Sequence, residues 1–150
     1  MKTLRAWITI ALVTAGAALT ACPGPSPTVE TDGALAGAWS PYSATIYYDA
    51  GGGGAFQGGS YSLTLSDSGT WSYGSSSGSW SVAPISSDDW TSWGIESYGP
   101  TRKLVLEGWN GGTASGPIEE ETDGTVNSLW AIYPYQSDQG PATVWLRFGH

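Results

Sequence analysis

Residues 61–82 read YSLTLSDSGTWSYGSSSGSWSV, and this stretch indicates the fold class. Large apolar side chains alternate with small polar ones from Tyr61 to Leu65, and the alternation resumes at Trp71 after a turn signal rich in Ser, Asp and Gly. A second turn signal precedes a third alternating run, which ends at Pro84. A period of two predicts half-buried β-strands joined as hairpins. We therefore expect three strands that run up, down and up.

Five further segments have the composition of strands and are bounded by Gly, Pro, Asn or Asp. They are 39–48, 91–98, 102–109, 125–133 and 143–148. Apolar residues do not recur at helical spacing after residue 37, so no helix is expected there. The glycine runs 51–54 and 58–59 and the acidic segment 110–123 are expected to be mobile loops. Eight short strands without helices predict an all-β fold, an eight-stranded antiparallel up-and-down barrel with a β-sandwich as the alternative.

The first 21 residues have the regions of an export signal. Lys2 and Arg5 give a basic start, residues 6–18 carry no charge, and small residues precede Cys22. The uncharged run is shorter than the roughly 20 residues that a membrane helix needs, so a cleaved signal is favoured. The sequence LTAC at 19–22 resembles the lipobox of bacterial lipoproteins. This resemblance implies that Cys22 becomes the acylated N-terminus of the mature chain.

The rest of the chain divides into a tether and a domain. Residues 22–36 are rich in Pro, Gly, Ser and Thr and predict a flexible tether, and 37–150 form the predicted barrel domain. Cys22 is the one cysteine, so no thiol remains for a disulfide or a metal. We expect a membrane-anchored protein of the cell envelope. Pro23 differs from the Asp that resembles an inner-membrane retention signal, which favours the outer membrane where the host has one.

The motif Gly-x-Trp opens the domain at 37–39 and recurs at 69–71 and 78–80. On a first strand this motif resembles the lipocalin and calycin superfamily. In that superfamily the first-strand Trp closes one barrel end, and a basic residue of the last strand lies across its indole. The resemblance implies these roles for Trp39 and Arg147. The short length and the absence of a Thr-Asp-Tyr motif are more similar to the short lipocalin-like domains of bacterial lipoproteins.

The charge balance argues against nucleic acid as a partner. The formal net charge is −8, and loss of the signal would leave three basic residues against thirteen carboxylates. Such a surface repels phosphate backbones. The acidic run Glu119–Glu121 is expected to be solvated, because the spacing of a calcium loop is absent. We expect neither a metal nor a cofactor.

Enzymatic chemistry is not expected. The single histidine, His150, is the last residue, where chain ends fray, so a Ser-His-Asp arrangement has no credible base. Paired carboxylates for acid-base work need two different environments at a defined separation. A hydrolase remains a minor alternative, with Glu96 and Glu107 as its best candidates.

The expected function, binding of a ligand, is inferred from the aromatic side chains. One set alternates along the strands and is assigned to the inner face: Tyr61, Leu63, Leu65, Trp71, Tyr73, Trp80, Val82, Leu104, Leu106, Val144, Leu146 and Phe148. A second set lies near strand ends or out of phase and is assigned to a ligand-binding mouth: Trp90, Trp93, Trp109, Tyr133, Tyr135 and Trp145. We expect a small apolar or amphipathic ligand. The alternative is an interaction module whose exposed aromatics bind polysaccharide or inhibit a partner protein.

Overall fold

The computed structural model describes residues 31–56 and 61–150. The predicted signal peptide, Cys22 and most of the tether lie outside these residues. The described elements are η1 (Gly33–Leu35), β1 (Gly37–Tyr48), β2 (Gly53–Phe56), β3 (Leu63–Leu65), β4 (Thr70–Tyr73), β5 (Ser76–Pro84), α1 (Ser87–Trp93), β6 (Arg102–Trp109), β7 (Gly112–Glu120), β8 (Val126–Ser137) and β9 (Gly140–Gly149). Within the described ranges, no helix is long and apolar enough to span a bilayer.

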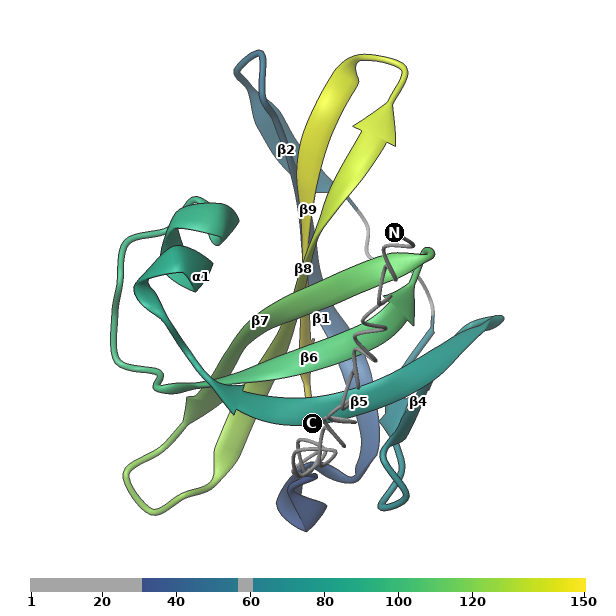
Figure 1. The fold of residues 1–150 in the computed structure, drawn as a ribbon, viewed down its shortest axis with the longest axis vertical. Coiled ribbons are helices and arrows are strands. Elements are labelled where there is room, and N and C mark those ends of the chain that lie inside the picture. The colour runs from purple at the N-terminus through teal and green to yellow at the C-terminus, as the bar shows by residue number, and fades with distance from the viewer. Residues whose placement is uncertain (1–30, 57–60) are drawn as a thin grey trace, which may run out of the picture.

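Eight of the strands form a closed antiparallel barrel, which confirms the predicted fold class (Figure 1). From β3 to β9 each strand pairs with the next one along the chain, and β9 closes the barrel against β1. The N-terminal part of β1 pairs with β3, and its C-terminal part pairs with the additional strand β2. Closure satisfies the backbone groups that an open sheet would leave unpaired at its edges.

The predicted number of barrel strands, eight, was right, but one of the segments predicted to be a strand was wrong. Residues 91–98, predicted as a strand, instead contain the end of α1 and a loop. The missing barrel strand is β7, which lies in the segment predicted to be a mobile loop. Part of the glycine-rich segment is also a strand, because Gly53 and Gly54 belong to β2.

A two-residue turn explains why β7 forms. Trp109 pairs with Gly112, so Asn110 and Gly111 alone connect β6 to β7. Their φ angles of 48° and 79° are both positive, as the turns that suit a two-residue hairpin require. Asn-Gly is the strongest short-range signal for such a hairpin. This signal was present in the sequence and was overlooked.

The helix α1 begins at a capping box and ends at a glycine. The Ser86 side chain accepts a hydrogen bond from the backbone N–H of Asp89, and the Asp89 carboxylate accepts one from the backbone N–H of Ser86. Gly94 ends the helix in the left-handed conformation. Trp90 and Trp93 lie three residues apart on one face and pack with Ile132 on the outside of the barrel. This outer cluster replaces the strand that the aromatic residues suggested.

The barrel interior is filled by side chains. The largest fully buried ones are Trp39, Trp71 and Trp80, and each indole N–H donates a hydrogen bond of 2.9 Å to a backbone carbonyl. Eleven of the twelve residues predicted for the inner face lie in this core or pack against it. The exception is Tyr61, whose side chain is 59% exposed. It precedes the first paired residue of β3 and therefore lies at the rim.

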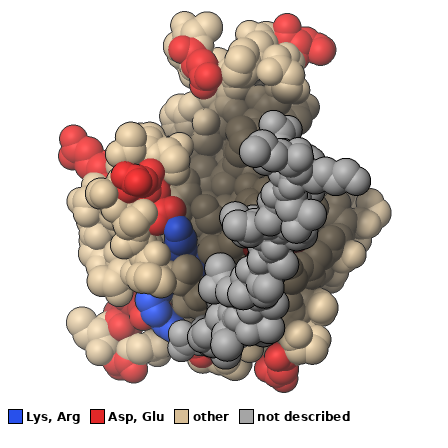
Figure 2. Space-filling model, in the orientation of Figure 1, with Lys and Arg blue, Asp and Glu red and all other residues tan. Residues whose placement is uncertain are grey.

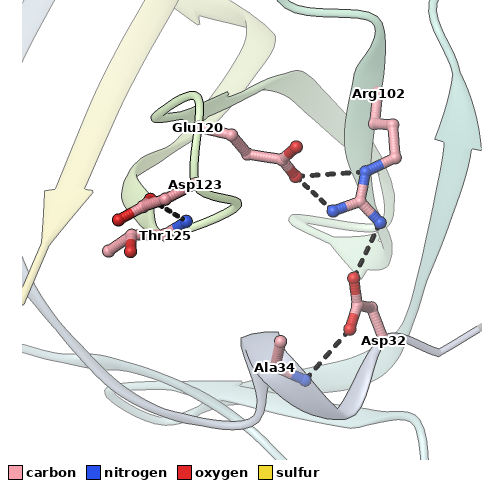
Figure 3. A network of polar contacts seen from close by, with 6 residues as sticks. All are labelled: Asp32, Ala34, Arg102, Glu120, Asp123 and Thr125. Atoms are coloured by element: carbon pink, nitrogen blue, oxygen red, sulfur yellow. Dashed lines mark hydrogen bonds and ion pairs between the residues drawn. The ribbon is translucent and has the colours of Figure 1, made fainter.

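The end of the barrel near Trp39 is closed. Leu35 of η1 is fully buried, and its carbonyl accepts the hydrogen bond from the Trp39 indole. Arg102 holds the start of η1 in place, because its guanidinium pairs with Asp32 at 2.7 Å and also with Glu120 at the end of β7 (Figure 3). The described contacts therefore extend to Asp32, within the segment predicted to be a tether.

Gly78 is a position at which no side chain fits. A Cβ atom there would lie 1.9 Å from the carbonyl oxygen of Glu107 and 2.7 Å from the indole nitrogen of Trp71, which are themselves hydrogen-bonded. We expect Gly78→Ala to lower the free energy of unfolding by about 3 kcal/mol, because it separates β5 from β6. Urea unfolding of the full-length protein measures this loss. Gly99→Ala, where a Cβ meets nothing within 4 Å, is the control and should change little.

Candidate functional site

The end of the barrel opposite Trp39 carries an open aromatic pocket, which we call the mouth. Its volume is about 460 Å³, within the range of roughly 300 to 1,000 Å³ typical of small-molecule sites. Four rings and three polar side chains line it: Tyr61, Tyr73, Trp109, Tyr133, Ser75, Ser76 and Asn110. Three of the four rings come from barrel strands, so a packed scaffold fixes their positions.

A change of register brings Trp109 to the inner face. The pairing of β6 with β7 shifts between Glu107 and Trp109, where Gly108 has a φ of 86°. Glu107 therefore points outward and is exposed, while Trp109 is only 5% exposed. A regular strand would place both residues on one face, because side chains repeat every second residue. The bulge thus supplies the floor of the mouth.

The rings of the mouth contact one another. Tyr73 stacks on Trp109 with ring centroids 5.3 Å apart, and the Tyr133 ring lies 5.6 Å from Trp109. Tyr61 meets the edge of Tyr73 at 5.9 Å. Trp71 packs beneath Trp109 at 4.9 Å and belongs to the filled core. A ligand would therefore rest on a ring surface at the barrel end rather than enter a deep lumen.

The mouth is electrically neutral. Its lining contains no Asp, Glu, Lys or Arg side chain. Burial raises the pKa of the Tyr73 and Tyr133 hydroxyls above the usual value, so both remain protonated at neutral pH. The hydroxyls can then donate as well as accept hydrogen bonds. The arrangement suits an uncharged molecule with an apolar face and a few polar atoms.

The structure separates the six aromatics that the sequence assigned to one mouth. Trp109 and Tyr133 do line it. Trp90, Trp93 and Trp145 instead lie in or against the cluster under α1, on the outer face of the barrel. Tyr135, 46% exposed, lies farther along β8, beyond the mouth. The sequence analysis missed Tyr61 and Tyr73 as residues of the mouth. Their alternation with Leu63 and Trp71 predicts that they lie on the inner face of the sheet, but it does not predict how close to the end of the barrel they lie.

The predicted contact between Arg147 and Trp39 was wrong. In β9, Leu146 and Phe148 point inward, so Arg147 lies on the outer face, whereas Trp39 is buried inside. The guanidinium lies 5.1 Å from the Tyr42 ring centroid and 5.3 Å from that of Trp130. The ring that meets Trp39 belongs to His150, with centroids 3.8 Å apart.

On the outer face, Arg147 belongs to a hydrogen-bonded network with Glu119. Its guanidinium pairs with the Glu119 carboxylate at 2.5 Å and also donates to the Ser128 hydroxyl. Tyr98 donates from its hydroxyl to the same carboxylate. Burial acts to raise the pKa of Glu119, but hydrogen bonds from Ser128 and Tyr98 and the charge of Arg147 lower it overall. The network joins the loop after α1 to β7, β8 and β9.

All three basic residues of the described chain are held in ion pairs. Arg102 pairs with Asp32 and Glu120, Lys103 pairs with Asp89, and Arg147 pairs with Glu119. Figure 2 shows carboxylates at several separate places on one face of the molecule, and the Lys and Arg groups visible in this view lie beside carboxylates. The remaining surface therefore lacks free positive charge in residues 31–56 and 61–150.

The two residues considered for catalysis lie at the surface of the described structure. Glu96 and Glu107 are both exposed, and the Glu107 carboxylate accepts a hydrogen bond from Ser79 on the outer face. Within the described ranges, His, Asp and Glu side chains nowhere gather in a group of three or more that could hold a metal ion. The carboxylates of the acidic run Glu119–Glu121 do not act as one group, because Glu119 pairs with Arg147 and Glu120 pairs with Arg102.

Compared with protein-family models, curated proteins and solved structures, the chain matches none.

Proposed function

We propose that this protein is a lipid-anchored, non-enzymatic binding protein of the cell envelope, whose lipocalin-like barrel holds a small, uncharged amphipathic molecule at its mouth. The observation that carries the proposal is the aromatic pocket formed by Tyr61, Tyr73, Trp109 and Tyr133. Aromatic walls with a few convergent polar groups are typical of small-molecule sites. The closed antiparallel barrel and the first-strand Trp39 at its closed end are compatible with a lipocalin-like domain.

The filled interior sets the shape of the ligand. Trp71 and Trp80 are buried beneath the mouth and each is about 1% exposed, so a long acyl chain has no lumen to enter. A planar or ring-shaped molecule can instead lie on Trp109 and Tyr73 at stacking distance. Ser75, Ser76 and Asn110 at the rim supply hydroxyl and amide groups for its polar atoms. We therefore expect compact ring compounds to bind better than fatty acids.

Binding of the neutral aromatic amine N-phenyl-1-naphthylamine tests the mouth. The full-length protein, labelled with 5-fluorotryptophan and held in lipid nanodiscs, should show a ¹⁹F shift of the Trp109 resonance and not of Trp80. We expect Tyr61→Ala to weaken binding about tenfold, because an aromatic contact contributes roughly 1 to 1.5 kcal/mol. Tyr61 is more than half exposed, so this variant should fold normally.

Tyr42→Ala is the matched control, since Tyr42 is 73% exposed and lies on the outer face. It should leave the affinity unchanged. Equal affinities of Tyr61→Ala and the parent protein, together with an unmoved Trp109 resonance, would rule out the mouth as the binding site.

A further inference from the structure

A second hollow lies on the outer face of the barrel and is lined by residues of α1, of the C-terminal end of β1 and of the N-terminal part of β9. We call it the outer groove. Its volume is about 360 Å³, and its lining includes Tyr47, Asp49, Thr91, Ser92, Thr143 and Trp145. None of these residues lines the mouth, so the two hollows are separate.

Both walls of the outer groove are fixed by hydrogen bonds. On the strand side, the backbone N–H of Asp49 donates to the Pro141 carbonyl at 3.1 Å, which places the turn after β1 against β9. On the helix side, the Trp93 indole donates to the Ser115 hydroxyl, and Lys103 pairs with Asp89 at the start of α1. The groove therefore exists before any ligand binds, and little ordering is needed.

One side of the outer groove presents aromatic surface. The Tyr47 ring is 46% exposed and packs against Trp145, with ring centroids 4.8 Å apart. The Trp145 indole nitrogen is buried, so the Tyr47 ring provides the aromatic surface that a ligand can contact.

Polar groups surround this aromatic surface. Asp49 and Thr143 have no side-chain hydrogen bond within the described structure, and both line the groove. The Thr91 and Ser92 hydroxyls donate to carbonyls of α1, which leaves their oxygen atoms free to accept. An apolar ligand would cover these groups without satisfying them, which costs free energy.

The charge of the outer groove disfavours an anionic ligand. Asp49 is the one carboxylate in the lining, and no Lys or Arg lines it. The three basic residues of the described chain are held in ion pairs at other places. A phosphate, sulfate or uronate would meet the Asp49 charge without a cation to balance it.

We propose that the outer groove binds a neutral oligosaccharide, with one sugar ring stacked on Tyr47. A sugar combines an apolar face of C–H groups with a rim of hydroxyls, and the groove combines an exposed ring with the polar side chains of Asp49 and Thr143. In the proposed complex, the Asp49 carboxylate accepts hydrogen bonds from two hydroxyls of the sugar. The proposal is independent of the ligand at the mouth.

Saturation-transfer NMR with tetra-N-acetylchitotetraose and maltotetraose tests the outer groove on the full-length protein in nanodiscs. We expect at least one of these neutral sugars to bind, and Tyr47→Ala to weaken it at least fivefold. Tyr47→Phe keeps the ring and should retain the affinity. Asp49→Asn is a second variant, which should also weaken binding and does not disturb packing, because Asp49 is exposed.

Two controls separate this site from the mouth. Tyr61→Ala and Tyr42→Ala should leave sugar binding unchanged, because neither residue lines the groove. Failure of both neutral sugars to bind would overturn the proposal. So would preferential binding of tetragalacturonate or tetralysine, or loss of sugar binding in Tyr61→Ala but not in Tyr47→Ala.

Discussion

Replacing Trp39 with Ala should remove a large part of the stability of the domain. Trp39 is fully buried, and its indole donates to the Leu35 carbonyl while its ring meets His150. Truncation leaves a cavity at the closed end and releases η1, so we expect a loss of about 4 kcal/mol. Small domains have only about 5 to 15 kcal/mol in total. Urea unfolding followed by circular dichroism measures the change.

Two variants make this measurement specific. Trp39→Phe keeps an aromatic ring but loses the N–H that donates to the Leu35 carbonyl. This lost hydrogen bond should lower the free energy of unfolding by about 1 to 2 kcal/mol, in addition to the effect of the smaller ring. Tyr42→Ala removes an exposed ring that contacts Arg147, and it should cost less than about 1 kcal/mol. If Trp39→Ala costs no more than Tyr42→Ala, Trp39 does not close the barrel.

Replacing Cys22 with Ser should abolish acylation completely. Cys22 is the one cysteine of the chain, so no other thiol can receive the lipid. Each buried methylene contributes about 0.8 kcal/mol to membrane binding, and several acyl chains would anchor the domain permanently. We expect cells fed labelled palmitate to label the parent protein and not the variant. Mass spectrometry of the parent should show an acylated N-terminus at residue 22.

The neighbouring Thr20→Ser variant serves as the control, because it keeps Cys22 and a small residue before it. It should be labelled like the parent. A parent protein without label, or a labelled Cys22→Ser variant, would remove the anchor from the proposed function.

Part of the candidate site could be predicted from the sequence. Trp109 and Tyr133 were assigned to a ligand-binding mouth because they lie near strand ends, and both line the pocket. Trp93 and Trp145 met the same criterion and lie elsewhere, because α1 covers the outer face of β8 and β9. A residue's position near a strand end does not determine on which face of the sheet its side chain lies, because a bulge or a helix can interrupt the regular alternation of side chains.

The sequence by itself determined the local and periodic features of this protein. Alternation from Tyr61 to Val82 was sufficient for the hairpins, because a period of two places apolar side chains on one face. The sequence also contains the Asn-Gly turn before β7 and the Ser86 cap of α1, and the analysis of the sequence missed both signals. Both act within a few residues, so no distant contact is needed to predict them.

Only the tertiary structure decided which faces became sites. The bulge at Gly108 turns Trp109 inward, and the pairing of β1 with β9 places Tyr47 beside Trp145 across about a hundred residues of chain. Arg147 lies outside rather than over Trp39 because the register of β9 puts Leu146 and Phe148 inside. Register between distant strands depends on the packing of the whole barrel, and a shift of one residue exchanges the two faces.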